Sequence, residues 1–269
     1  HSDIAGALQR SFEKIVFHLL HVLKKNGTKS GNLVLAGGAA MNCVFNGLLD
    51  EKKIYKNNFI PPWPDDLGVT IGALYLANQK YSAKKIKPKR LRSAYLGPNY
   101  NNDKILSIIK KFKIKYKKPK NLLVYTAGEI AKKKLIGWFQ GKMEFTHRAL
   151  GNRSILADPR GKSIQNTINS AVKYRESFRP FAPSVLEEDA HKIFHLDKNM
   201  KIDFMEKAVK VRKNWRDKIP AVTHVDNTAR VQTVSKDYNK MFYKLLKEFK
   251  KQTNVPVLVN TSFNLNGQP

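Results

Sequence analysis

The chain of 269 residues is long enough for one large domain or two ordinary ones, and its hydrophobic content of 42% is sufficient for a substantial core. No run of about 18 apolar residues is present, which argues against a membrane span, and the single Cys43 excludes an internal disulfide and favours a reducing cytoplasm. The net charge of +29 raises the question of a polyanionic partner such as nucleic acid.

Lysines and arginines are distributed differently along the chain. Of the 50 basic residues, 39 are Lys and 11 are Arg. The Lys residues are spread widely, with runs at 83–90 and 109–120, whereas five Arg fall between residues 148 and 179. Arg recognises phosphate in a bidentate way, while scattered Lys often only solvates a surface. We therefore interpret the Lys excess mainly as solvated surface, with polyanion contact as the alternative.

The first part of the chain predicts helices joined to a short buried strand. Residues 2–25 have apolar side chains at helical spacing, which indicates an amphipathic helix. Residues 32–49 predict a strand, a Gly-Gly turn and a helix, and residues 61–79 predict a Pro-rich loop that enters another helix. The polar, Lys-rich segment 81–93 suggests a domain boundary, which we place after residue 92.

The second part predicts further alternation of helices and strands. Residues 122–145 predict a helix followed by a strand, and residues 238–263 predict a helix followed by a buried strand. Mixed helices and apolar strands favour an α/β fold in both parts. The sequence begins within a helix and stops soon after a strand, so we expect both ends to be cut from a longer polypeptide.

Two motifs in the first part are candidates for ligand contact. AGGAAMN contains Gly37, Gly38 and Asn42 after a strand, where backbone N–H groups can approach a phosphate or a sugar. The alternative is a tight strand-to-helix turn. PDDLG contains Asp65 and Asp66, which could provide a metal ligand or could cap the helix that follows.

The run GKMEFTHRALGNRSILADPR, residues 141–160, mixes apolar and charged side chains. Apolar residues alternate with the polar set Glu144, Arg148, Asn152, Arg153, Ser154, Asp158 and Arg160. A segment that is both apolar and rich in Arg favours the lining of a pocket. The alternative is a structural network in which Glu144 and Asp158 pair with the arginines.

Two polar pairs with a spacing of two residues are the strongest candidates for a catalytic site. Lys173 and Arg175 form a cationic pair, and Ser262 and Asn264 form a neutral pair after the buried strand VPVLV. Side chains two residues apart in extended backbone point the same way, and ligands bind at the carboxyl ends of strands in α/β domains. Together the pairs could hold the phosphates of a nucleotide. A strand-end turn is the alternative for Ser262 and Asn264, and Arg179 could contact a ligand or form a salt bridge.

These motifs together resemble the NodU/CmcH-type O-carbamoyltransferases, which decorate nodulation factors and antibiotics. The resemblance extends over essentially the whole chain and rests on LVLAGGAAMNCVFNG, PDDLGVTIGA, GKMEFTHRALGNRSILADPR, VKYRESFRPFAPSVL, IPAVTHVDNTARVQTV and VPVLVNTSFN. PDDLG corresponds to a Gly-Asp-Ala-Gly segment of the family. The family's Glu-Phe-Gly-Pro-Arg is replaced here by Glu-Phe-Thr146-His147-Arg148, and its His-Val-Asp-Gly ends here in Asn227.

The resemblance implies two modules and a set of site residues. Residues 1–92 would be the end of an actin-like ATPase-fold domain, and residues 93–269 a YrdC-like α/β domain with a mixed twisted sheet, truncated at its end. The hallmark Lys-x-Arg and Ser-x-Asn of the second module correspond to the catalytic candidates Lys173, Arg175, Ser262 and Asn264. In the first module, the residues implied to contact a nucleotide-like ligand are Gly37, Gly38 and Asn42. Asp66 corresponds to a ligand of iron or another divalent metal whose other ligands would lie before His1.

The activity implied is ATP-dependent O-carbamoyl transfer. Carbamoyl phosphate and ATP would form carbamoyladenylate in the second module, where the binding residues would be Arg148, Arg153, Ser154 and Arg230. The carbamoyl group would then pass to a hydroxyl of a sugar or secondary metabolite. We expect a cytoplasmic enzyme that needs no membrane or nucleic acid, with a homodimer as a possible assembly. Two alternatives stay open: a basic RNA-binding module related to tRNA threonylcarbamoylation, and an inactive fragment.

Overall fold

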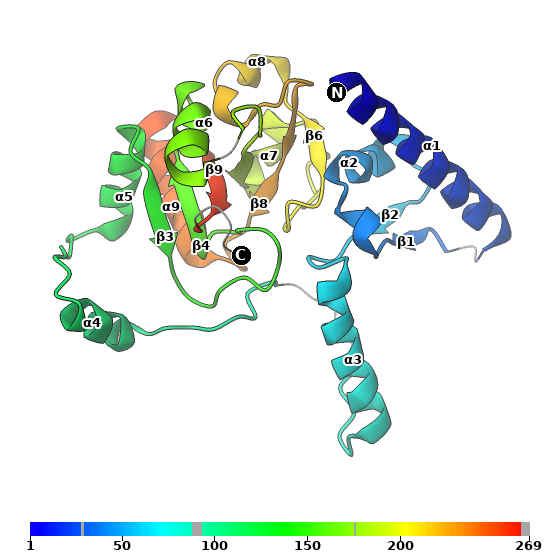
Figure 1. Cartoon of the computed structure of the whole chain (residues 1–269), viewed down its shortest axis with the longest axis horizontal. Helices are drawn as coiled ribbons and strands as arrows, with labels where there is room; N and C mark the ends of the chain where they lie inside the picture. The colour runs from blue at the N-terminus through cyan, green and yellow to red at the C-terminus, as the bar shows by residue number, and fades with distance from the viewer. Residues whose placement is uncertain (28–29, 88–92, 175, 265–269) are drawn as a thin grey trace.

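The computed structural model describes residues 1–27, 30–87, 93–174 and 176–264. Figure 1 shows that the helices and strands of the N-terminal part lie to one side of a larger body that contains the main sheet. Helices and strands alternate in both parts, which confirms the α/β fold expected from the sequence. Among the described residues, none of the helices is both long and apolar enough to cross a membrane.

The first part contains a small parallel sheet and three long helices. Its elements are α1 (Ser2–Asn26), β1 (Asn32–Val34), a 3-10 helix (Gly38–Met41), α2 (Cys43–Lys52), β2 (Asn57–Phe59) and α3 (Asp66–Tyr81). β1 pairs with β2 in parallel. Their core contains Leu20, Leu33, Phe45, Leu49, Ile54 and Ile60. The predicted strand, Gly-Gly turn and helix over residues 32–49 are therefore confirmed.

The second part is built on a five-stranded mixed sheet with the order β3-β4-β9-β5-β8. The strands are β3 (Ile136–Phe139), β4 (Arg153–Ala157), β5 (Ala182–Leu186), β8 (Gln232–Val234) and β9 (Val257–Ser262). β5 and β8 are parallel, and the other pairs are antiparallel. A separate antiparallel pair joins β6 (Ala208–Lys210) to β7 (Thr228–Arg230).

Helices cover this sheet and close its core. They are α5 (Leu122–Ala131), α6 (Ser163–Ile168), α7 (Glu187–Ile193), α8 (Lys213–Arg216) and α9 (Lys240–Thr253), with a 3-10 helix at Pro220–Val222. α5 and α9 contact each other, and α9 buries Phe242, Leu245, Leu246 and Phe249 against the sheet. This spacing of three and four residues places all four side chains on one face of the helix. The predicted helix and buried strand over residues 238–263 are confirmed.

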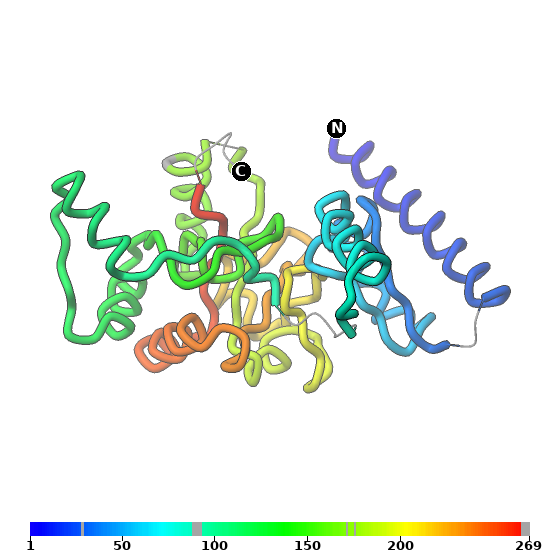
Figure 2. The backbone as a smooth tube through the Cα atoms, turned by 90° about the horizontal axis from the view of Figure 1, so that it is seen from below, coloured from blue at the N-terminus to red at the C-terminus, as the bar shows by residue number. Residues whose placement is uncertain are grey.

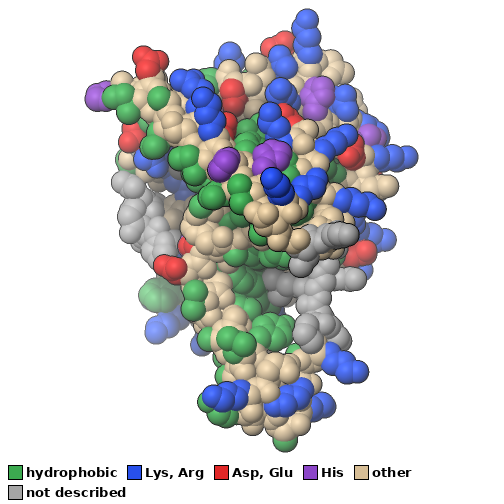
Figure 3. Space-filling model, turned by 90° about the vertical axis from the view of Figure 1, so that its right-hand side faces the viewer, with side chains coloured by type: hydrophobic (Ala, Val, Ile, Leu, Met, Phe, Trp, Pro, Cys, Tyr) green, Lys and Arg blue, Asp and Glu red, His purple; other side chains and the backbone are tan. Residues whose placement is uncertain are grey.

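A basic excursion, defined here as residues 102–120, extends from the second part on the side away from the first part (Figure 1). It begins with α4 (Asn102–Lys111) and continues as an irregular segment. Figures 1 and 2 both show it standing away from the sheet. On the face of the molecule seen in Figure 3, by contrast, Lys and Arg side chains are interspersed with other types.

The two parts meet where α2 contacts β6. A Cβ atom added to Gly47 would lie 1.9 Å from the carbonyl oxygen of Ala208, so only glycine permits this approach. Asn46 donates to the carbonyl of Glu206 at 2.9 Å, and Lys207 forms an ion pair with Asp50 at 2.6 Å. A second contact lies nearby, where the ring of Trp63 meets that of Phe145. The junction is therefore closely packed.

Candidate functional site

Lys173 lies at the carboxyl end of β9, beside the two residues with which the sequence paired it. Its buried ammonium donates to the side-chain oxygen of Asn264 at 2.6 Å, to the hydroxyl of Ser262 at 3.2 Å and to the carbonyl oxygens of both residues. The Ser262 hydroxyl donates to the Asn264 side chain at 2.6 Å. Three of the four catalytic candidates therefore meet. The fourth, Arg175, lies outside the described residues.

The backbone before Lys173 accounts for this placement. α6 continues into a five-residue π-helical turn at Asn169–Lys173, and Tyr174 ends it in the left-handed conformation with φ of 46°. The side-chain amide of Asn169 donates to the carbonyls of Ser177 and Arg179 at 3.2 and 3.1 Å, which ties the next loop to the turn. Such π-helical turns occur frequently at functional sites. The turn brings Lys173 under the end of the sheet.

Arg148 and Arg153 line a cavity of about 350 Å³ beside this cluster. Its other walls are formed by Met143, Glu144, Thr146, His147, Ala149, Ser262 and Asn264. The cavity is large enough for a small ligand. The predicted pocket lining in residues 141–160 is thus placed next to the Ser262–Asn264 pair, on the side of the sheet end where β4 begins.

Glu144 organises the loop instead of pairing with an arginine. Its Oε1 accepts hydrogen bonds from the backbone N–H groups of Leu150 at 2.7 Å and Asn152 at 2.9 Å. The alternative of a structural arginine network holds for Arg160, which forms a bidentate ion pair with buried Asp158. It does not extend to Arg148.

The guanidinium of Arg148 has no carboxylate within ion-pair distance in the described part of the chain. Burial lowers its pKa, and this effect is opposed only by the nearby Cys43 thiol. Arg153 donates from Nε to the carbonyl of Phe263 at 3.2 Å. A partly buried cation without an acidic partner is costly, and a bound anion would offset that cost. The cavity therefore has the charge expected of an anion site.

The other two binding candidates of the second part have different environments. The hydroxyl of Ser154 is fully buried and accepts from the backbone N–H of Gly151 at 3.1 Å, so it stabilises a turn. Arg230 ends β7, beside His224, whose pKa is lowered by burial and further by Arg230. On β5, Ser184 pairs with Gln232 of β8 and Ala182 pairs with Asn260 of β9. Arg230 precedes Gln232 by two residues, so it lies toward the same end of the strands as Ser262.

The Gly-Gly turn of the first part leaves an open cradle. Gly37 has φ of 97°, a conformation that favours glycine, and a Cβ atom at Gly37 or Gly38 would meet nothing within 4 Å. The side-chain oxygen of Asn42 accepts from the N–H of Phe45 and caps α2, and its amide donates to Gln9. Asn42 therefore has a structural role here, whereas the two glycines leave space for a ligand.

The acidic pair at the start of α3 does not cap that helix. Asp65 occupies the N-cap position without a side-chain cap hydrogen bond, so the capping interpretation is wrong. Its Oδ2 instead lies 2.8 Å from Nε2 of His147, and its buried Oδ1 has no hydrogen-bond partner. Asp66 is exposed. Within the described residues no three His, Cys, Asp or Glu side chains gather as a metal site would require, so the implied metal has at most one or two ligands here.

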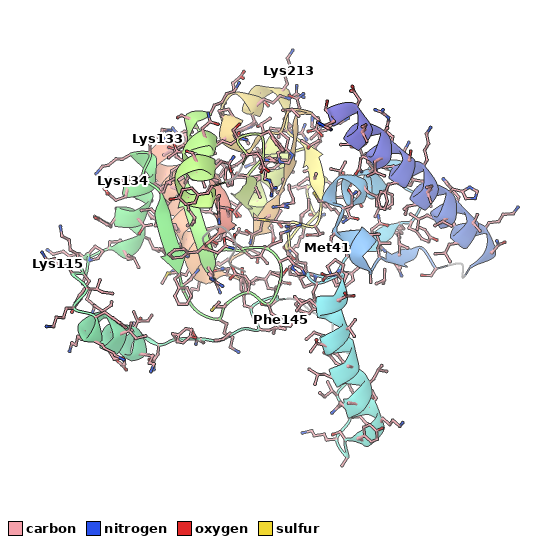
Figure 4. The ribbon with its side chains drawn as sticks, in the orientation of Figure 1. Met41, Lys115, Lys133, Lys134, Phe145 and Lys213 are labelled. Atoms are coloured by element: carbon pink, nitrogen blue, oxygen red, sulfur yellow. The ribbon has the colours of Figure 1, made fainter. Side chains whose placement is uncertain are left out.

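A second, smaller cavity of about 30 Å³ lies at the junction, near Met41 and Phe145 in Figure 4. His147 and Arg148 line it from the second part, together with Glu206, and Met41, Pro62 and Pro64 line it from the first. Burial raises the pKa of Glu206 to about 7. Sequence patterns did not indicate Glu206. His147 was visible only as a departure from the family motif.

Each of the two parts of the chain matches a known protein family. Residues 127–269 match the family described as Carbamoyltransferase C-terminus, and residues 1–75 match Carbamoyltransferase N-terminus. The chain is 42% identical to the nodulation protein NolNO of Sinorhizobium fredii, over all of this chain and 40% of that protein. It is 40% identical to nodulation protein NolO of Bradyrhizobium diazoefficiens, over all of this chain and 50% of that protein. The chain thus spans half or less of the length of these relatives.

Proposed function

The chain belongs to the carbamoyltransferase family, and we propose that it carries the adenylation site of an ATP-dependent O-carbamoyltransferase. In this proposal carbamoyl phosphate and ATP react in the cavity of about 350 Å³ to form carbamoyladenylate. The observation that carries the proposal is the meeting of Lys173 with Ser262 and Asn264 next to that cavity.

The proposed first reaction requires two anions to approach each other. Carbamoyl phosphate loses phosphate with the uptake of one water, and an oxygen of the resulting carbamate attacks the α-phosphorus of ATP. A new P–O bond forms as the bond to pyrophosphate breaks. Arg148 and Arg153 are the cationic groups on the cavity wall. Preorganised cations of this kind stabilise the charge that develops on the transferring phosphoryl group.

Lys173 has a different role in this proposal. Its ammonium is already surrounded by oxygens of Ser262 and Asn264, so it fixes the conformation of the strand end. It also keeps a positive charge there, which attracts phosphate. The Ser262 hydroxyl and the Asn264 amide would then orient a phosphate or carbamoyl oxygen. Arg175 and Arg230 remain proposed contributors to the same site.

The proposed second reaction transfers the carbamoyl group to a hydroxyl of a sugar or secondary metabolite. The hydroxyl oxygen attacks the carbamoyl carbon, its proton passes to solvent, and AMP departs as the bond between the carbamoyl carbon and the AMP phosphate oxygen breaks. The open cradle at Gly37 and Gly38 is the proposed contact for the nucleotide part. A divalent metal, when bound, would make the attacking hydroxyl more acidic. The described residues provide no complete ligand set for such a metal.

Isotope exchange tests the proposed function. The purified protein should exchange labelled pyrophosphate into ATP only when carbamoyl phosphate is present, because the adenylate must form reversibly. Exchange that is independent of carbamoyl phosphate would contradict the proposal, as would its complete absence in a protein that binds ATP.

The basic excursion favours a second candidate function, contact with nucleic acid. Residues 102–120 contain eight Lys and one Asp, and large apolar side chains such as Phe112 and Tyr116 are exposed among them. Lys115, labelled in Figure 4, lies on this excursion, far from the cavity. Binding of single-stranded RNA should then weaken steeply with salt and be lost when Lys113, Lys115 and Lys117 are changed to Gln. Unchanged binding in that variant would exclude this surface.

A further inference from the structure

Three consecutive side chains of the loop 144–149 contact the Pro-rich loop of the first part. The ring of Phe145 meets that of Trp63 at 5.6 Å in an edge-on arrangement. The hydroxyl of Thr146 donates to the carbonyl of Pro62 at 2.6 Å. His147 completes the series through Asp65, with 2.8 Å between Nε2 and Oδ2. The loop that carries Arg148 is therefore held from the other side of the junction.

Arg148 follows these three contacts directly and lines both cavities. Its own side chain has no acidic partner among the described residues to fix its direction. A long, flexible guanidinium side chain loses substantial conformational entropy when it is held in one place. Its position therefore depends on the backbone of the loop, and hence on the anchors at residues 145–147.

Without His147, the carboxylate of Asp65 would lack a side-chain polar partner. It makes no cap hydrogen bond to α3, and its Oδ1 is buried without a partner. The ion-pair contact with His147 is the one side-chain polar contact that the described residues provide for this carboxylate. An unsatisfied buried carboxylate is strongly unfavourable, so Asp65 and His147 hold each other in place.

We infer that Asp65 and His147 form a positioning pair that sets Arg148 against the anion bound in the larger cavity. The inference rests on the proposed function, because it takes the ligand of that cavity to be a phosphate-bearing substrate. Both residues act through Arg148 and need not touch the substrate.

The test is a double-mutant cycle on ATP affinity, measured by calorimetry with the purified protein and ATP alone. Arg148→Ala should weaken ATP binding, and His147→Ala and Asp65→Ala should each weaken it by about tenfold, as coupled neighbours do. His147→Ala should have no further effect in the Arg148→Ala background. His147→Gln, which keeps an N–H donor for Asp65, should retain most of the affinity.

Controls separate positioning from simple destabilisation. Lys201→Ala removes an ion pair with Glu187 of comparable exposure far from the cavity, and should leave ATP affinity unchanged. If His147→Ala fails to fold, the comparison of His147→Gln with Asp65→Asn provides the same test. Unchanged ATP affinity in His147→Ala would contradict the positioning role of Asp65 and His147, and so would an equal loss of affinity in the wild-type and Arg148→Ala backgrounds. Either result would leave Arg148 as an ATP contact. Unchanged affinity in Arg148→Ala would overturn the pair and the proposed cavity together.

Discussion

The ammonium of Lys173 lies 2.6 Å from the side-chain oxygen of Asn264, although 91 positions separate the two residues in the sequence. The contact exists because a π-helical turn ends at Lys173 directly beneath the end of β9. It joins the cationic and neutral halves of the proposed phosphate site.

Arg148 and Arg160 should behave oppositely when each is replaced by Ala. Arg148 is a partly buried cation without a carboxylate partner in the described chain, so its loss should weaken ATP binding about tenfold and leave the melting temperature unchanged or higher. Arg160 shares the buried Asp158 with Lys133 and makes the bidentate contact, so its loss should reduce the free energy of unfolding by about 2 kcal/mol with little effect on ATP binding. Calorimetry and thermal unfolding check both results, and the reverse pattern would refute the assignment.

Gly47 should be essential for the junction between the two parts. Gly47→Ala places a Cβ atom 1.9 Å from the carbonyl oxygen of Ala208, and overpacking of this kind costs about 1–3 kcal/mol. The variant should melt at a lower temperature than the wild type. Gly72→Ala is the matched control, because a Cβ atom there meets nothing within 4 Å and Ala favours a helix. Equal stability of the two variants would show that the α2–β6 contact is not tight.

Stability should fall in mildly acidic solution because of His224. Burial lowers its pKa in the folded protein, and Arg230 adds to this effect while Asp226 opposes it. The unfolded chain, with an ordinary His pKa of about 6.5, therefore binds the proton more readily. The contribution of neutral His224 is present above that pH and is lost as the pH falls below it. Denaturant unfolding measured from about pH 7.5 to about pH 5, a range that brackets the ordinary His pKa, should show the free energy of unfolding falling as the pH falls.

His224→Gln isolates this effect. The variant should lose the part of the pH dependence that arises from His224, while His195→Gln, at an exposed position, should keep it. An identical pH profile in the wild type and His224→Gln would mean that other groups account for any acid sensitivity.

The sequence carried enough information for the local elements and for one long-range relationship. The strand, turn and helix over 32–49 and the helix and strand over 238–263 follow from apolar periodicity and glycine placement, which act over short distances. The partnership of Lys173 with Ser262 and Asn264 was predicted from spacing and resemblance, and the structure brings the three together.

Contacts that depend on tertiary structure could not be predicted in the same way. Asp65 was expected to cap α3 or, with Asp66, to provide a metal ligand, but the fold turns it toward His147. Glu144 was a possible arginine partner and instead accepts three backbone hydrogen bonds from its own loop. The near-neutral pKa of Glu206 arises from burial at the junction, which no local pattern encodes.

The most direct test of the proposed adenylation site is carbamoyl-phosphate-dependent ATP–pyrophosphate exchange in Lys173→Ala, compared with the wild type. Loss of one preorganised cationic donor should cost on the order of 3 kcal/mol of transition-state stabilisation, a decrease of roughly a hundredfold in the exchange rate. Lys198→Ala, at an exposed position of the second part, serves as the control and should exchange normally. Exchange retained at the wild-type rate in a folded Lys173→Ala protein would show that the contact between Lys173, Ser262 and Asn264 is structural and that adenylation, if it occurs, takes place elsewhere.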